Sequence, residues 1–276
     1  MKLAVIIRSI GERTTELCAV RASMSFPGVK ILVMADDEPF ETKLTSCMEA
    51  ALKIGAEWTW MLDADVALRE GAGRWVQERL KHVHPLVYNV EAMVLDKFLP
   101  TRQGARPAGN HLCRTKLFRR ALKYVPGLNG EVRPETYIKQ RMAHAGYPTL
   151  ETEDVIGVHD FFQTYYHIYW KNYLQSYKHR GRVEMLKPYW KEWSRVDGDY
   201  AVALEGVRAG IKAQEGGAAF QGVQRDRETV NVVLSQRELA EKRRIAPGQI
   251  PAYERRVQEL IAVADWYDMN LKKHKK

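Results

Sequence analysis

Residues 1–160 alternate short apolar runs with segments of helical character, and this alternation restricts the fold more than any other feature of the sequence. Apolar runs that have the length of buried strands lie at 3–7, 29–34 and 58–62. Segments with the composition or apolar spacing of helices lie between them, at 14–25 and 42–54. Strands that alternate with helices predict an α/β, Rossmann-like fold with a mostly parallel sheet flanked by helices.

The overall composition is that of a folded globular chain. Hydrophobic residues make up 45% of the 276 positions and charged residues 28%, which excludes disorder throughout the chain. No stretch reaches the roughly 18–20 apolar residues that span a bilayer, and the first apolar run, which ends at Arg8, does not fit a signal peptide. We therefore expect a cytoplasmic protein. The three cysteines are widely spaced, which fits neither a disulfide framework nor a cysteine-rich zinc site.

Positive charge is concentrated toward the C-terminus. The formal net charge is +9, and residues 166–276 hold 21 Lys and Arg against 14 Asp and Glu, whereas residues 1–165 hold 22 against 20. We predict a nearly neutral domain at 1–175 and a basic, mainly helical region at 176–276. The basic region suits an anionic partner, and its charged helices offer surfaces for pairing in an oligomer. A solvated basic face explains the same charge equally well.

The most informative local pattern is Asp63-Ala64-Asp65, directly after the third apolar run. In open α/β folds, ligands bind in the crevice at the carboxyl ends of the strands. Two carboxylates there are hard oxygen ligands for Mg²⁺ or Mn²⁺, and such an ion can bridge the phosphates of a nucleotide. A surface turn is the commoner origin of the pattern by itself, but the strand that precedes it favours a binding role.

The order of these segments resembles the GT-A glycosyltransferases over about residues 1–175. The resemblance rests on the run at 3–7 with the turn at 8–13, the run at 31–35 that leads to Asp36-Asp37, and the helix–strand–acid segment at 43–65. That family normally has a Tyr-Asn pair in the first turn, where this chain has Ile10-Gly11. The resemblance implies metal-dependent transfer of a sugar from a nucleotide-sugar donor, most often a UDP-sugar, to an acceptor hydroxyl.

A second segment, Pro134 to Arg141 followed by Gly146-Tyr147, is similar to the E-D-x(5)-R-x(4)-G-Y helix of the inverting branch of that family. On this register Glu135 takes the place of the catalytic base, which deprotonates the acceptor hydroxyl as it attacks the anomeric carbon. A glutamate in the first turn of a helix is also favoured by the helix dipole alone. Retaining GT-A enzymes carry an acidic residue nearby as well, so the stereochemistry of transfer stays open.

The same resemblance assigns the metal and donor contacts. Asp65 and His159 are the expected metal ligands, and Asp63 contacts the ribose or reaches the metal through water. Imidazole ligation favours Mn²⁺ over Mg²⁺. The expected contacts to the donor's base and phosphates are Asp36 or Asp37, together with Arg8, Ser9 and Arg13 in the first turn.

The expected acceptor contacts are His111, where the family's acceptor loop falls, and Arg182, in the basic stretch 178–182. Packing within the loop explains His111 equally well, and closure over the donor diphosphate is a second role for the basic stretch. Aromatic residues recur at helical spacing through 161–177, which predicts a helix packed on the sheet. The basic residues interleaved with them are also the mixture that binds nucleic acid. For most of these rings, packing is the better explanation. The basic C-terminal part, with no membrane-spanning run and no secretion signal in the sequence, instead predicts a soluble polyanionic acceptor. The candidate is a hydroxymethylated base in DNA that is flipped out of the duplex.

Two alternatives remain open at this point. One is transfer onto a bacterial surface glycan or a lipid-linked sugar, with the basic region meeting an anionic membrane. The other is a non-catalytic nucleic-acid-binding protein on a GT-A-like core, whose DNA binding would not depend on Mn²⁺, UDP or Asp65. A sugar nucleotidyltransferase is disfavoured because residues 8–12 do not form the glycine-rich turn that such enzymes carry.

Overall fold

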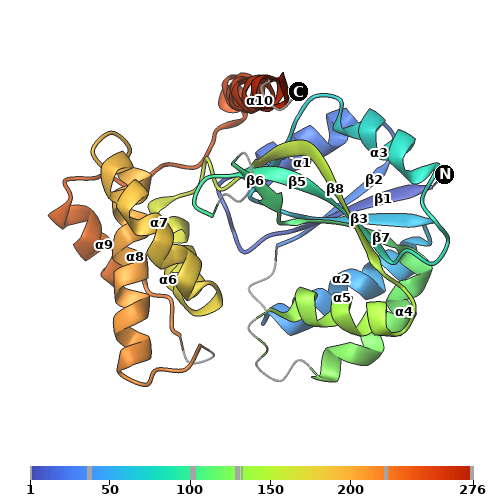
Figure 1. The fold of residues 1–276 in the computed structure, drawn as a ribbon, viewed down its shortest axis with the longest axis horizontal. Coiled ribbons are helices and arrows are strands. Elements are labelled where there is room, and N and C mark those ends of the chain that lie inside the picture. The colour runs from blue at the N-terminus through green and yellow to red at the C-terminus, as the bar shows by residue number, and fades with distance from the viewer. Residues whose placement is uncertain are drawn as a thin grey trace. The chain divides into compact units, whose positions relative to one another are not determined.

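The computed structural model describes residues 2–35, 39–99, 104–127, 131, 133–220 and 223–273 (Figure 1). The chain forms two compact units. Unit 1 comprises residues 1–129, 134–161 and 245–276, and unit 2 comprises residues 130–133 and 162–244. The division differs from the predicted boundary after residue 175, because the aromatic helix belongs wholly to unit 2 and the chain returns to unit 1 at residue 245.

Unit 1 is built on one eight-stranded sheet in the order β2-β1-β3-β7-β5-β8-β4, with β6 paired to β5. The strands are β1 (Leu3–Arg8), β2 (Lys30–Met34), β3 (Trp58–Asp63), β4 (Val66–Leu68), β5 (Asn89–Asp96), β6 (Ala105–Pro107), β7 (Asn110–Arg114) and β8 (Thr149–His159). The predicted α/β class is confirmed, and the predicted runs at 3–7 and 58–62 are β1 and β3.

The sheet is mixed rather than mostly parallel. Among the described strands, β1–β2, β1–β3 and β5–β8 pair in parallel, and the other pairs are antiparallel. The connection from β5 to β6 is short, since β5 ends at Asp96 and β6 begins at Ala105. Such a connection cannot hold a crossover helix. The chain therefore turns back along β5, and β6 and β7 run antiparallel to it.

Helices cover both faces of the sheet (Figure 1). Successive residues of a strand point to opposite faces, so Val5 and Trp60 enter one core and Ile6 and Met61 the other. The first core packs against α1 (Thr15–Ser25) and α3 (Ala72–Leu80). The second packs against α2 (Phe40–Ile54), η1 (Thr115–Leu117), α4 (Phe118–Ala121), η2 (Leu122–Gly127) and α5 (Pro134–His144). Cys18, Cys47 and Cys113 are buried in these cores and are not joined in disulfides.

Strand direction gathers polar residues at one edge of the sheet. β1 and β3 are parallel, β5 and β8 are parallel, and both pairs run antiparallel to β7. The last residues of all four strands therefore lie at the same edge. In the register, Arg8 is opposite Asp63 and Asp96 is opposite His159. This is the end of the sheet at which the sequence predicts a ligand site.

The C-terminal part is mainly helical, as predicted. Unit 2 contains α6 (Tyr165–Lys178), α7 (Arg180–Trp193), α8 (Gly198–Glu215) and α9 (Arg227–Gln236), and unit 1 receives η4 (Pro247–Gln249) and α10 (Ile250–Lys273). The predicted aromatic helix is α6, and within unit 2 it packs along α8. None of the described helices combines the length and the apolar content that crossing a bilayer requires.

Two glycines of α8 allow it to approach α6 closely. A Cβ atom at Gly206 would lie 2.3 Å from the carbonyl oxygen of Tyr169, and one at Gly210 would lie 2.5 Å from that of Tyr173. Real Cβ atoms do not come this close to backbone oxygens. The two helix backbones are therefore in near contact at positions where only glycine fits.

We expect Gly206→Ala to destabilise the protein by about 1–3 kcal/mol, because the added methyl forces the two helices apart. Urea unfolding followed by circular dichroism measures this free energy. The control is Gly181→Ala on α7, where a Cβ meets nothing within 4 Å and an alanine costs nothing or stabilises slightly. Equal stability of the two variants would contradict close α6–α8 packing.

Candidate functional site

Two groups of polar side chains occupy the edge where the strands end. The first, here called the charge network, consists of Arg8, Asp63, Glu91, His111, Glu135 and Lys139. The second, here called the acid–histidine cluster, consists of Asp65, Asp96, His159 and Asp160. All these residues belong to unit 1.

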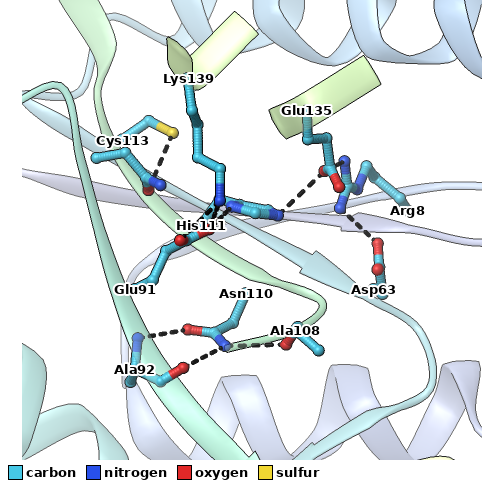
Figure 2. Close-up of polar contacts among 11 residues, drawn as sticks. Arg8, Asp63, Glu91, Ala92, Ala108, Asn110, His111, Cys113, Glu135 and Lys139 are labelled. Carbon is cyan, nitrogen blue, oxygen red and sulfur yellow. Dashed lines mark hydrogen bonds and ion pairs between the residues drawn. The ribbon is translucent and has the colours of Figure 1, made fainter. Parts of the chain in front are cut away.

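Arg8 is the centre of the charge network. It ends β1 with only 4% of its surface exposed, and its Nη2 lies 2.6 Å from Asp63 Oδ1. Its Nη1 donates to the carboxylate of Glu135 (Figure 2). Burial by itself would lower the pKa of Arg8, but the two carboxylates outweigh it and raise that pKa above its usual value. Arg8 is thus a permanent buried cation that joins β1, β3 and α5.

Glu135 stands in the first turn of α5, directly after Pro134, which is a favoured first residue of a helix. Its Oε1 accepts a hydrogen bond from His111 Nε2 at 3.1 Å, and Nδ1 of the same imidazole lies 2.7 Å from Glu91 Oε1. Lys139 Nζ donates to both oxygens of Glu91 at 2.8 Å. Figure 2 shows these contacts as one chain from Lys139 to Asp63. Charges of alternating sign therefore fix Glu135 in place.

The charges in this network stabilise each other's ionised forms. Burial opposes the imidazolium, yet Glu135 and Glu91 raise the pKa of His111 to about 9. Burial likewise opposes ionisation of Glu91, but His111 and Lys139 lower its pKa to about 2. For Glu135, the pull of Arg8 and His111 exceeds the effect of burial and holds its pKa well below the usual range. At neutral pH, Glu135 is a carboxylate held between two cations.

The network has one accessible side. The side chains of Asp63 and Glu135 are 32% and 29% exposed, whereas Arg8, Glu91 and His111 are buried. The side chain of Lys139 is 23% exposed, so a molecule from solvent can meet the two carboxylates and this ammonium group. His111 contacts Glu135 from the buried part of the network, and its role as an acceptor contact stays a prediction.

The acid–histidine cluster contains a candidate metal site. Asp65 follows β3, His159 ends β8, and Asp160 comes next in the chain. One potential ligand atom from each of the three lies within 4.8 Å of the others. Two carboxylates and one imidazole are a donor set that fits Mn²⁺ or Mg²⁺, and the imidazole favours Mn²⁺. Three protein ligands also leave coordination positions open for a substrate.

The backbone at Asp160 is unusual in a way that serves this cluster. Asp160 has a backbone φ of 69°, which lies in the left-handed region that residues other than glycine seldom adopt. Its N–H donates to the carbonyl oxygen of Asp65 at 3.3 Å, which ties the end of β8 to the segment after β3. Strained backbone of this kind concentrates at functional sites.

Asp96, at the end of β5, orients His159. Its Oδ2 accepts a hydrogen bond from His159 Nδ1 at 2.7 Å and from Arg106 Nε at 2.6 Å. Its Oδ1 accepts from the backbone N–H groups of Phe98 and Leu99. Because Nδ1 is engaged by Asp96, Nε2 is the ring nitrogen that faces Asp65, 3.4 Å away, and it is the one available to ligate an ion. A carboxylate behind a ligating histidine is a common support of metal sites.

The structure brings most of the predicted site residues together. Asp65 and His159 share the acid–histidine cluster, and Glu135 lies in the charge network with Arg8. Asp63 pairs with Arg8 and is not part of the candidate metal site, so the two aspartates of Asp63-Ala64-Asp65 have different neighbours. The ribose contact expected of Asp63 stays a prediction.

The other residues predicted to bind donor or acceptor lie outside the charge network and the acid–histidine cluster, or outside the described residues. Ser9 Oγ donates to Glu12 Oε2 at 2.8 Å within the first turn, and Arg13 Nη2 donates to the hydroxyl of Tyr253 on α10 at 2.8 Å. Arg182 lies on α7 in unit 2. Asp36 and Asp37 lie outside the described residues.

Sequence reasoning missed four members of the site: Glu91, Asp96, Lys139 and Asp160. Asp96 carried a usable signal, because it ends an apolar run as Asp63 does. Glu91 and Lys139 carried none, because each is a single charge whose partner is set by strand register and helix packing.

No protein-family model matches this sequence, and no curated protein matches it. Among solved structures, the chain is similar to a glycosyltransferase involved in glycosylation of the major capsid of PBCV-1, at 14% identity and a TM-score of 0.42 over 59% of this chain and 95% of that one. It is also similar to the mannosyltransferase PcManGT from Pyrobaculum calidifontis, determined with GDP-Man and Mn²⁺, at 11% identity and a TM-score of 0.40 over 86% and 79%.

A cytidylyltransferase from Leptospira borgpetersenii is similar at 11% identity and a TM-score of 0.39, over 56% of this chain and 76% of that one. All three similarities are distant.

The charge network makes stability depend on pH. The contribution of His111 is complete below its ordinary pKa of 6.5 and disappears as the pH rises through about 9. We expect the free energy of unfolding to fall by about 3 kcal/mol over this range on account of His111. Urea unfolding at pH 6.5 and 9.5 measures the fall.

His111→Gln should remove most of this pH-dependent difference, whereas His82→Gln, at an exposed position, should retain it. A fall of the same size in His111→Gln as in the wild type would contradict the network.

Support of His159 by Asp96 predicts the effect of Asp96→Asn. This variant keeps an acceptor oxygen but loses the charge that polarises the imidazole, so Mn²⁺ affinity should fall about 10–100-fold. Calorimetric titration with Mn²⁺ measures the affinity, and thermal unfolding checks that the variant is folded. Asp154→Asn, at a surface pair with Arg79, should bind Mn²⁺ as the wild type does. Unchanged affinity in Asp96→Asn would remove Asp96 from the site.

Proposed function

We propose that this protein is a metal-dependent glycosyltransferase that moves a sugar from a nucleotide-sugar donor to an acceptor hydroxyl. The observation that carries the proposal is that one sheet edge holds both a three-ligand cluster, Asp65, His159 and Asp160, and an ionised, positioned carboxylate, Glu135. Sugar transfer from a nucleotide donor uses one site to neutralise the diphosphate and another to accept the acceptor's proton.

Asp65, His159 and Asp160 would hold the metal ion. When bound, the ion supplies Lewis-acid stabilisation of the charge that develops on the leaving diphosphate. Arg8, fixed between Asp63 and Glu135, adds a permanent positive charge at the same edge. We propose Mn²⁺ as the ion because of the imidazole in the ligand set, and a UDP-sugar as the donor because of the resemblance to GT-A enzymes.

Glu135 is proposed as the base. The acceptor oxygen bonds to the anomeric carbon, its proton passes to a carboxylate oxygen of Glu135, and the bond from that carbon to the diphosphate oxygen breaks. The nucleoside diphosphate leaves with the electron pair. Because Arg8 and His111 lower its pKa, Glu135 is a weak base that is always ionised near neutral pH. Its contribution is therefore correct placement more than basic strength.

Two acceptor classes remain candidates, a hydroxymethylated base in DNA and a surface glycan or lipid-linked sugar. Arg182, the acceptor contact predicted in the basic region, lies on α7, so the surface of this helix bears on the choice. A non-catalytic nucleic-acid-binding protein is a weaker explanation, because such a protein needs neither a supported metal site nor a positioned carboxylate.

The donor site can be tested by calorimetric titration of UDP with and without Mn²⁺. We expect binding with Mn²⁺ and at least tenfold weaker binding without it, because Asp65, His159 and Asp160 reach the diphosphate through the ion. Asp65→Asn should lose the Mn²⁺-dependent part, and Asp154→Asn should keep it. If neither UDP nor any other nucleoside diphosphate binds in the presence of Mn²⁺, the proposed function is wrong.

The role of Glu135 predicts a separation of binding from turnover. Glu135→Gln should bind UDP and Mn²⁺ as the wild type does but lose about 10²–10⁴-fold in transfer rate. The readout is UDP release from UDP-sugars in the presence of hydroxymethylated DNA or of lipid-linked sugars. Glu151→Gln, at an exposed position of β8, is the matched control. Transfer at the wild-type rate in Glu135→Gln would refute its assignment as the base.

A further inference from the structure

Helix α7 belongs to unit 2 (Figure 1). It exposes a row of large apolar side chains. Met185, Tyr189 and Trp193 follow each other at every fourth position, and Val196 lies in the turn after the helix. Their exposed fractions are 62%, 64%, 56% and 84%. Residues spaced in this way share one side of a helix. These four residues are called the apolar stripe below.

Apart from a ring contact of Trp193 with Tyr200 on α8, the anchoring of α7 in unit 2 comes from other residues of the helix. Val183 and Trp190, on the other side of the helix, are buried and anchor it. Among the described residues of unit 2, the remaining large hydrophobic side chain with comparable exposure is Val232 on α9. Single exposed apolar residues are ordinary, but a contiguous row of them marks a contact surface.

Positive charge accompanies the stripe. Residues 180–195 hold five basic side chains, Arg180, Arg182, Lys187, Lys191 and Arg195, against two acidic ones, Glu184 and Glu192. Unit 2 as a whole holds 16 Lys and Arg against 11 Asp and Glu. The pairs Lys187–Glu184 and Arg195–Glu192 are exposed, so their members remain available to another charged surface. Helical spacing places Arg182 and Glu192 beside the apolar stripe and Lys187, Lys191 and Arg195 in a separate row. The helix therefore has an apolar side and a cationic side.

This combination suits an anionic lipid surface. Amphipathic helices that lie in the membrane interface bury an aromatic and aliphatic side at headgroup level and place Lys and Arg beside the lipid phosphates. Tyr and Trp are enriched at that level because their rings are apolar and their polar tips stay wet. Nucleic acid fits less well, since Met185 and Val196 have no aromatic plane to stack on a base. An apolar partner protein would not require the surplus of positive charge.

We infer that α7 docks unit 2 on an anionic lipid bilayer, with Met185, Tyr189, Trp193 and Val196 inserted at headgroup level. This surface lies in unit 2 and goes beyond the proposed transferase activity, whose proposed metal ligands and base all lie in unit 1. Docking and transfer can therefore fail or succeed separately. If docking occurs, an acceptor carried by a lipid fits the protein better than a base in DNA.

The test is co-sedimentation of the full chain with vesicles of phosphatidylcholine that contain a minority of phosphatidylglycerol. We expect binding to these anionic vesicles at low salt, at least tenfold weaker binding to pure phosphatidylcholine, and weaker binding at high salt because salt screens the lipid charge. The double variant Met185→Ser/Tyr189→Ser should lose at least tenfold in vesicle affinity. Val232→Ser, which removes a comparably exposed apolar side chain, should bind as the wild type does.

Thermal unfolding establishes that both variants are folded. Gel shifts measure their DNA binding, and analytical ultracentrifugation measures their self-association. The inference is overturned if the wild type does not bind the anionic vesicles, or if Met185→Ser/Tyr189→Ser binds them unchanged. It is also overturned if the double variant loses DNA binding or self-association while vesicle binding persists, because α7 would then serve nucleic acid or a second copy of the chain.

Discussion

A guanidinium buried at the end of β1 constrains the whole site. A buried charge without counter-charges costs several kcal/mol, so Arg8 requires the carboxylates that flank it. One comes from β3 through the parallel register that sets Arg8 opposite Asp63, and the other comes from α5, much further along the chain. Glu135 in turn holds His111, and His111 holds Glu91. The position of the proposed base thus follows from the need to neutralise Arg8.

The segment after β3 serves two purposes at once. Ala64 is fully buried in the core shared with α1 and α3, and this anchors the chain between the two aspartates. Asp63 is left beside Arg8, while Asp65 reaches His159. A pattern that reads as one metal-binding motif is therefore divided between a charge network that positions a carboxylate and a cluster able to hold an ion. The charge network and the acid–histidine cluster lie close together because only Ala64 separates Asp63 from Asp65 in the chain.

The sequence predicts those parts of the fold that depend on local pattern. Continuous apolar runs identify β1 and β3, and Pro134 marks the start of α5 directly before Glu135. β8 is harder to predict because its first half alternates Glu151 and Glu153 with threonines and only its end is apolar. The pairing of Asp96 with His159 depends on the register of β5 and β8, which shifts twice along their length. Interactions of this kind are fixed by tertiary structure and leave no periodic signal.

The boundary between the units shows the same limit. The aromatic spacing of α6 predicts a buried helix face correctly, but an apolar face packs equally well on a sheet or on another helix. The helix on which α6 packs is set by Gly206 and Gly210 of α8, because they let the backbone of α6 come close. These glycines are distant in the sequence, since the whole of α7 lies between α6 and α8. Whether a segment forms a helix depends on its own sequence, whereas the element it packs against depends on distant residues.

The most direct test of this account is a crystal structure of the protein soaked with Mn²⁺ and UDP, with anomalous diffraction recorded at the manganese edge. We predict one anomalous peak bounded by Asp65, His159 and Asp160, with Asp63 still paired to Arg8. A peak coordinated by Asp63 and Asp65 together, with Arg8 released from Asp63, would contradict the division of roles between the two aspartates. A metal-free edge with UDP bound would contradict the metal site itself.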